Sequence, residues 1–212
     1  MHVPDGFLST PVWATLDAVA VGSVAVALRR AKGALGEKQV STLGVASAFT
    51  FAAQMVNFPV GAGTSGHYVG GAMLAILLGP SVALLAVFVV LLVQALLFAD
   101  GGLLALGANL VNMGIVAPLV GLAAFRIVGS RTPRRAAVGG FLAGLLGAEA
   151  SALAAGAQLA ISGTAPAGPV LLAMGGVHLV IGVGEGLVTA AAVRFLCRAR
   201  PDLVPGLETQ RA

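Results

Sequence analysis

The hydrophobic pattern of the chain consists of seven apolar runs separated by short polar segments. The runs cover residues 11–29, 39–58, 68–79, 81–99, 103–128, 135–162 and 170–197. A helix needs about 20 apolar residues, at 1.5 Å rise per residue, to cross the hydrocarbon core of a bilayer. The third run is shorter than this. The pattern predicts an all-α integral membrane protein, a single transmembrane domain over residues 1–212 that forms a bundle of seven transmembrane helices.

The positions of the 12 Lys and Arg residues predict the orientation of the helices. They form three clusters: Arg29, Arg30, Lys32 and Lys38; Arg126, Arg131, Arg134 and Arg135; and Arg194, Arg198, Arg200 and Arg211. Because cytoplasmic connections carry an excess of Lys and Arg, an even number of crossings should separate successive clusters. The number of crossings between the first two clusters is even only if the short run 68–79 also crosses the membrane. The N-terminus is therefore expected outside and the C-terminus in the cytoplasm.

Composition agrees with a bilayer as the solvent. Charged residues make up 9% of the chain, whereas soluble domains carry about 25%. The 30 glycines fit close helix packing, and Gly140 and Gly144 have the spacing of such contacts. A net charge of +4 could indicate a nucleic-acid partner, but the basic residues lie at the ends of the apolar runs. We therefore expect a lipid bilayer and no nucleic acid.

The first two residues can form a metal chelate. The amine of Met1, the amide nitrogen of His2 and the Nδ1 atom of its imidazole can close two fused rings around one ion. Such ligation favours square-planar Ni(II) or Cu(II) and leaves one planar position for another imidazole. His67 is expected to fill it, because it is the other histidine nearest the outer side in the predicted topology. A second-position histidine outside such a context usually binds nothing.

The surroundings of His2 support this role. The start MHVPDGF has no basic residue before the first apolar run, so it lacks a signal peptide's n-region, and we expect Met1 and His2 to be retained. Pro4 restricts the residue before it to extended conformations, and Gly6 permits a sharp turn. Residues 1–10 are therefore expected to be an external metal-binding segment that folds back into the bundle.

Residues 57–67, NFPVGAGTSGH, are expected to form an irregular polar loop at membrane depth. Such backbone persists only where protein or a water-filled cavity covers it. The segment either lines a binding site or is a tight structural turn. His67 would then open a short third helix.

Further polar residues lie within the apolar runs and should face the bundle interior. Asn109 and Asn112 share one helix face, and they could support metal ligands or hydrogen-bond across helices. His178 and Glu185 lie two turns apart on the last run, and Glu149 lies on the sixth. These three could form a proton or metal relay, and a buried structural pair is the simpler interpretation.

Four segments together resemble the CbiM/NikM family: MHVPDGFLS, NFPVGAGTSGHYVGGAMLAILLGP, QALLFADGGLLALGANLVNMG and HLVIGVGEGLVTA. The resemblance implies the substrate-capture component of an energy-coupling factor transporter for cobalt or nickel, with the metal held by Met1, His2 and His67. By extrapolation from the same matching segments, three further residues are expected to support the metal ligands: Asn57, Ser65 and Asn109.

The resemblance also implies partners and a location. The partners are a transmembrane coupling component, two ABC ATPase subunits and a small accessory membrane subunit, in the cytoplasmic membrane of a bacterium. The chain has no GxxxxGK sequence followed by Ser or Thr, so we expect a transporter subunit without its own ATPase, not an enzyme. Ni(II) or Co(II) would be the transported substrate, with no organic cofactor. Square-planar nitrogen ligation slightly favours nickel.

Two other functions remain open. The sequence GTSG at residues 63–66 matches a pattern of intramembrane serine proteases, with Ser65 as nucleophile and His178 as base. That chemistry needs the two side chains within hydrogen-bond reach. Alternatively, an autonomous secondary transporter could use Glu149, Glu185 and His178 as an ion path.

Overall fold

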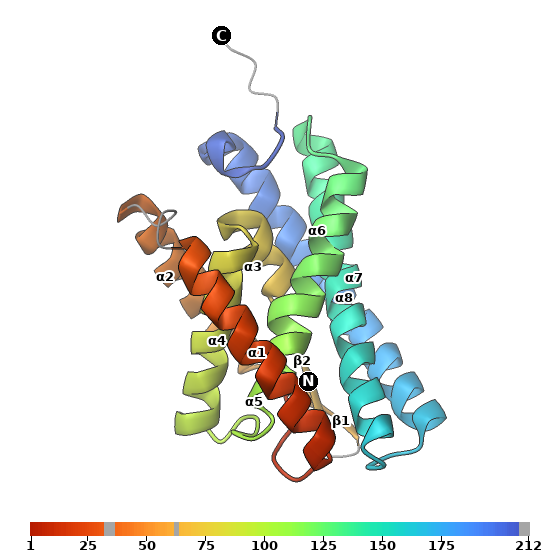
Figure 1. The fold of residues 1–212 in the computed structure, drawn as a ribbon. Helices are drawn as coiled ribbons and strands as arrows, with labels where there is room; N and C mark the ends of the chain where they lie inside the picture. The colour runs from red at the N-terminus through yellow and green to blue at the C-terminus, as the bar shows by residue number, and fades with distance from the viewer. Residues whose placement is uncertain (32–36, 62–63, 208–212) are drawn as a thin grey trace.

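The computed structural model describes residues 1–31, 37–61 and 64–207, which are mostly helical. The helices are α1 (Thr10–Ala31), α2 (Glu37–Gln54), α3 (Gly71–Leu78), α4 (Pro80–Leu97), α5 (Leu106–Leu110), the π-helix η1 (Val111–Val116), α6 (Ala117–Val128), α7 (Pro133–Ile161), α8 (Ala167–Ala199) and the short 3₁₀-helix η2 (Pro201–Leu203). The strands are β1 (Asn57–Gly61) and β2 (Thr64–His67). Figure 1 shows the helices as one bundle, with β1 and β2 at the end opposite the C-terminus.

Five described helices are long and apolar enough to cross a membrane. They are α1, α4, the continuous helix Leu106–Val128 formed by α5, η1 and α6, then α7 and α8. A multi-pass membrane protein is thereby confirmed. The apolar part of α2 is shorter, Leu43–Gln54, and the eight residues of α3 rise only about 12 Å.

Residues 57–79 contain two kinds of structure, a hairpin followed by a short helix. Residues 57–67 were expected to be an irregular loop, but β1 and β2 pair as an antiparallel hairpin, with Asn57 opposite His67. His67 therefore ends a strand and does not open a helix. After the link Tyr68–Gly70, α3 begins at Gly71 and ends before Gly79, which adopts a φ of 78°. His67 is carried by the extended part of this segment, at the end of β2, and it is buried.

Glycines allow α7 and α8 to pack with their backbones in contact. A Cβ atom on Gly144 would lie 2.8 Å from the carbonyl oxygen of Glu185, and one on Gly186 would lie 2.6 Å from that of Phe141. Any larger residue would force the helices apart. The predicted small-residue contact at Gly140 and Gly144 is thus made with α8 of the same chain.

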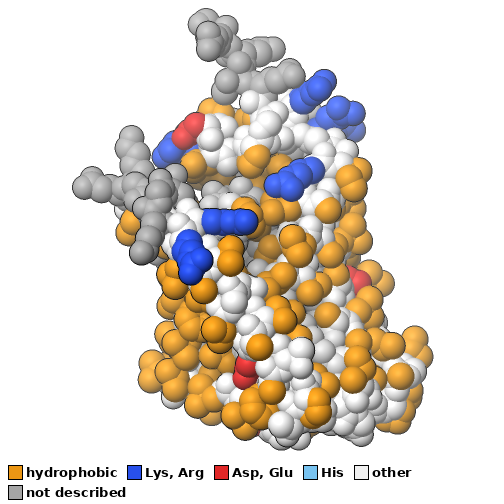
Figure 2. Space-filling model, in the orientation of Figure 1, with side chains coloured by type: hydrophobic (Ala, Val, Ile, Leu, Met, Phe, Trp, Pro, Cys, Tyr) orange, Lys and Arg blue, Asp and Glu red, His pale blue; other side chains and the backbone are white. Residues whose placement is uncertain are grey.

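Lys and Arg side chains gather in the half of the bundle that carries the C-terminus, as Figure 2 shows. Arg29 and Arg30 lie in the last turn of α1, and Arg198 lies in the last turn of α8. Lys32 and Arg211 lie outside the described residues, as does the side chain of Lys38. One end of the bundle is therefore basic.

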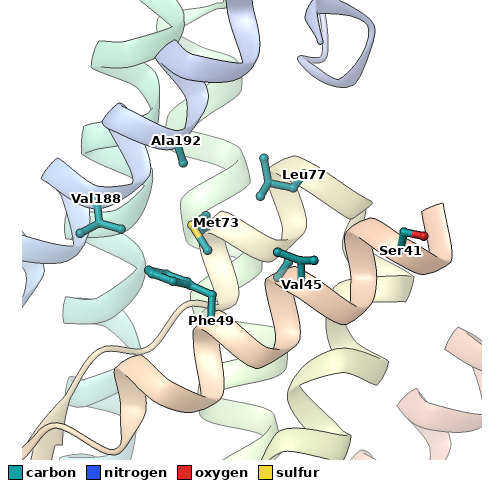
Figure 3. A pocket seen from close by; sticks show the side chains of 8 residues that line it. Ser41, Val45, Phe49, Met73, Leu77, Val188 and Ala192 are labelled. Carbon is teal, nitrogen blue, oxygen red and sulfur yellow. The ribbon is translucent and has the colours of Figure 1, made fainter. Parts of the chain in front are cut away.

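An open pocket of about 560 Å³ lies between α2, α3 and α8. It is lined by Ser41, Val45, Ala46, Phe49, Met73, Leu77, Val188 and Ala192. Figure 3 shows that these side chains come from three helices around one apolar space. Among the residues that the structure describes, no His, Asp, Glu or Cys lines it, so this pocket does not suit a metal ion.

Candidate metal centre

The N-terminus lies inside the bundle, beside β2 (Figure 1). Met1 and Val3 are completely buried, and His2 is only 3% exposed. The backbone N–H of Val3 donates to Oδ1 of Asn109 at 2.8 Å, and Nδ2 of Asn109 donates to the Val3 carbonyl at 3.1 Å. The N–H of Gly102 reaches the same carbonyl at 3.0 Å. Both polar groups of Val3 are satisfied, which allows this backbone to be buried.

Asp5 fixes the other end of the N-terminal segment. Its carboxylate accepts hydrogen bonds from the backbone N–H groups of Leu103, Leu104 and Ala105 at 3.1, 2.8 and 3.2 Å. The contact is so close that a Cβ atom on Gly102 would lie 2.0 Å from Oδ1 of Asp5. The sequence MHVPDGF is therefore held against the connection between α4 and α5.

Met1, His2 and His67 converge next to β2. The Met1 amine donates to Oγ of Ser65 at 3.1 Å. The imidazoles of His2 and His67 are stacked, with ring centroids 4.3 Å apart and planes inclined by 29°. Ser65 and His67 lie two residues apart on β2, so their side chains share one face of the strand. The hairpin thus places a hydroxyl and an imidazole against the first two residues.

The hydrogen bonds of His67 determine which of its nitrogens is available. Nδ1 lies 2.7 Å from the carbonyl oxygen of Tyr68 and can only donate to it. Nε2 therefore carries a lone pair in the neutral ring, and it is buried without a partner among the described residues. A histidine held in this way is typical of metal ligands.

His2 is held differently. Its Nδ1 atom lies 2.9 Å from Oδ1 of Asp100, and its Nε2 atom has no partner in the described part of the chain. Asp100 was not among the predicted site residues. A carboxylate in an outer connection, close to a histidine, was the available signal, since metal-binding histidines commonly pair with carboxylates.

Burial keeps the nitrogen donors neutral. It lowers the pKa of the Met1 amine from 8.0 to about 4, although the charge of Asp100 opposes the decrease. Burial also lowers the pKa of His2, against the hydrogen bond and charge of Asp100. Burial would raise the pKa of Asp100, but its hydrogen bond with His2 brings the pKa below the ordinary value. The amine and the imidazole can therefore offer lone pairs without first losing a proton.

The other predicted residues have different surroundings. Ser65 contacts the Met1 amine, and Asn109 contacts Val3. Asn57 pairs with His67 in backbone register but is exposed. Asn112 turns to α7, where its amide forms two reciprocal hydrogen bonds with Gln158 at 2.9 and 2.6 Å.

His178 and Glu185, both on α8, do not form the predicted buried pair. Both carboxylate oxygens of Glu185 accept backbone hydrogen bonds, from Val69 at 2.7 Å and from Gly70 at 2.9 Å. Nδ1 of His178 donates to the carbonyl of Met174 at 2.8 Å. Among the described residues, no hydrogen bond links His178 to Glu185 or to Ser65.

Comparison with known proteins identifies the family. The family model described as "Cobalt uptake substrate-specific transmembrane region", CbiM, matches residues 2–203. The chain belongs to the CbiM family. It is 36% identical over 221 residues to the cobalt transport protein CbiM of Sorangium cellulosum, covering 100% of this chain and 97% of that protein.

A second CbiM-family relative has a fused architecture. The chain is 35% identical over 224 residues to the fused nickel transport protein NikMN of Rhodobacter capsulatus, covering 96% of this chain but 64% of that protein. The family therefore includes proteins named for cobalt and for nickel transport, and proteins with an additional fused part.

Solved structures share the CbiM-family fold. A truncated transition metal transporter superimposes with a TM-score of 0.84 at 33% identity, covering 94% of this chain and 99% of that one. Another transition metal transporter gives 0.83 at 33% identity, covering 94% and 93%. The fold is that of a membrane transporter.

Side chains alone do not account for a metal site in this CbiM-family chain. In the residues that the structure describes, no three His, Cys, Asp or Glu side chains are placed to hold one ion. A site at His2 and His67 would therefore need donors beyond these side chains, such as backbone nitrogens. The buried Met1 amine and the His2 amide are the nearest such groups in the sequence.

Proposed function

We propose that this chain is the metal-capturing subunit of an energy-coupling factor type ABC transporter that imports Ni(II) or Co(II) across the bacterial cytoplasmic membrane. The ion is its substrate. The observation that carries the proposal is the convergence of a buried, neutral N-terminal amine with the imidazoles of His2 and His67. Relatives named for nickel or cobalt transport support it.

Four nitrogens would hold the ion: the Met1 amine, the His2 amide, Nδ1 of His2 and Nε2 of His67. His67 already presents Nε2 without a partner. For His2, the ring must make a half-turn about its Cβ–Cγ bond, because Nδ1 now faces Asp100. Asp100 would remain beside the site, where its negative charge offsets that of the ion.

The donor set favours nickel. Ni(II) accepts a square plane of nitrogens and gains more from such ligands than Co(II) does. Zinc would require a tetrahedral arrangement, commonly with thiolates or carboxylates. The proposed order of affinity is therefore nickel above cobalt.

The proposed topology has seven crossings with the N-terminus outside. The basic end of the bundle would then face the cytoplasm. The third crossing would combine β2, the link Tyr68–Gly70 and α3, and its extended half would carry His67. This arrangement supports an ion site that opens toward the outer side.

Transport would require partner subunits. We infer a transmembrane coupling component and two ABC ATPases, because the sequence contains no Walker A motif of its own. The fused architecture of the NikMN relatives supports a small accessory membrane subunit of the CbiN/NikN type. ATP-driven partners would shift this chain between conformations that bind and release the ion.

The test is metal retention by the purified chain. Protein in detergent is incubated with Ni(II) or Co(II), freed of unbound ion, and its bound metal is quantified. One ion per chain is expected for the native protein. His67→Ala and a variant with one alanine inserted after Met1 should lose it, whereas an alanine inserted in the 129–132 connection should not. Native retention by the Met1 insertion variant would overturn the chelate.

Dependence on ATPases separates the capture subunit from a secondary carrier. Cells that produce this chain without ATPase partners should accumulate little nickel or cobalt, and cells that also produce the partners should accumulate it. Full uptake without the ATPases would replace this proposal with an autonomous transporter.

A further inference from the structure

Glu185 is a buried acid in the centre of the bundle that the proposed metal site does not use. It is 1% exposed, and both of its oxygens are bound by the backbone N–H groups of Val69 and Gly70. An acidic side chain inside a membrane bundle is costly to bury unless its oxygens are hydrogen-bonded. Two short hydrogen bonds to consecutive amides meet that requirement.

These amides belong to the link between His67 and α3. Within this link, the Tyr68 carbonyl accepts from Nδ1 of His67, and the Val69 carbonyl accepts from Nε2 of Gln54 at 2.8 Å. Side chains from α8 and α2 thus hold the link from two sides. The link in turn orients the imidazole whose Nε2 faces the site.

The link has little freedom to move while these bonds persist. Gly70 has a φ of 78°, and a Cβ atom on Gly71 would lie 2.0 Å from the carbonyl oxygen of Met113 in η1. The backbone of Glu185 packs closely against α7, because a Cβ atom on Gly144 would lie 2.8 Å from the Glu185 carbonyl oxygen. The position of His67 therefore follows the position of α8.

We propose that Glu185 is a positioning residue for the metal ligand His67. With Gln54, it clamps the link Tyr68–Gly70, and movement of α8 that carries this link with it withdraws His67 from the ion. The inference rests on the proposed capture of Ni(II) or Co(II). In this mechanism, α8 controls whether His67, one of the four ligands, stays on the ion. Once His67 has left, the remaining N-terminal nitrogens hold the ion more weakly.

Glu185→Gln tests the clamp. The Gln amide accepts one of the two backbone hydrogen bonds but presents its NH₂ group to the other donor. The rate of Ni(II) loss to an external chelator should rise roughly 10-fold or more, as for other residues that orient a ligand. Glu149→Gln is the matched control, since this acid on α7 has no bond to the link, and its Ni(II) loss should stay native. Equal effects of both variants would overturn the proposal.

A double-mutant cycle distinguishes positioning from a general loss of structure. His67→Ala keeps too little ion for the retention assay, so this comparison is made at equilibrium with excess Ni(II). In that background, Glu185→Gln should leave the residual Ni(II) affinity of the N-terminal chelate unchanged within about twofold, because no ligand remains for it to position. If Glu185→Gln weakens binding as much there as in the native chain, Glu185 does not act through His67.

Gln54→Met supplies an independent variant if Glu185→Gln fails to fold. It removes the donor to the Val69 carbonyl and keeps the side-chain length. Faster Ni(II) loss in Gln54→Met alone, but not in the His67→Ala background, supports the clamp. Native Ni(II) loss in Gln54→Met overturns it. If instead the native chain retains no ion, or His67→Ala retains it fully, the proposed capture function fails.

Discussion

Asn109 satisfies both backbone polar groups of Val3, accepting from its N–H at 2.8 Å and donating to its carbonyl at 3.1 Å. This pair connects α5 to the residue that follows His2. Four residues further along the same helix, the Met113 carbonyl contacts Gly71 of α3, beyond the link to His67. One continuous helix therefore supports both halves of the proposed site.

Replacing Asn109 with alanine should loosen the N-terminal chelate. Val3 would lose two hydrogen bonds, and its buried N–H would lose its acceptor. We expect Ni(II) affinity to fall about 10- to 100-fold, as for other residues that orient ligands. Competition with a chromogenic chelator measures the change. Asn112→Ala is the matched control: it removes the bond to Gln158 and should lower thermal stability while leaving Ni(II) affinity native.

Proton release should report the state of the Met1 amine. Because burial lowers its pKa to about 4, the amine is neutral at pH 7, and protonation competes with metal only at lower pH. Binding one Ni(II) at neutral pH should then release about one proton, from the His2 amide. An amine with its ordinary pKa of 8.0 would contribute nearly one more. Calorimetry in buffers of different ionisation enthalpy counts these protons, and a value near two contradicts the neutral amine.

Asp100→Asn should weaken ion binding through charge. The amide keeps nearly the same shape but removes the negative charge beside His2 and the Met1 amine. A decrease in Ni(II) affinity of about tenfold is expected, measured by equilibrium dialysis. Asp17→Asn changes a carboxylate that binds the backbone N–H of Gly107 and serves as the control. If both substitutions leave affinity unchanged, Asp100 does not offset the charge of the ion.

The packing of α7 and α8 predicts opposite effects of two alanines on the same helix. A Cβ at Gly186 would meet the Phe141 carbonyl, whereas nothing lies within 4 Å of one at Gly184. Gly186→Ala should cost about 1–3 kcal/mol through overpacking. Gly184→Ala should be neutral or gain up to about 1 kcal/mol from helix propensity. Thermal unfolding in detergent compares them, and equal midpoints would contradict the close helix contact.

Much of this protein can be predicted from its sequence. Length and hydrophobicity alone predicted a multi-pass helical bundle, because a helix in lipid must satisfy its own backbone and present apolar side chains. The Lys and Arg residues lie at the ends of the apolar runs, and an even number of predicted crossings between their clusters places them at one end of the bundle. The family was identifiable because its motifs recur through nearly the whole chain, and the candidate ligands Met1, His2 and His67 stand within those motifs.

Tertiary structure decided what the local pattern could not. A short third helix was foreseen, but hydrophobicity does not reveal a strand in a short glycine-rich segment, so the hairpin Asn57–His67 was not. Asp100 acts through its hydrogen bond with His2, which lies 98 positions earlier in the sequence. The hydrophobic periodicity of a chain does not predict such a long-range contact. Likewise, Glu185 binds the backbone of the link next to His67, not His178 on its own helix, because buried N–H groups of irregular backbone require an acceptor from a neighbouring element.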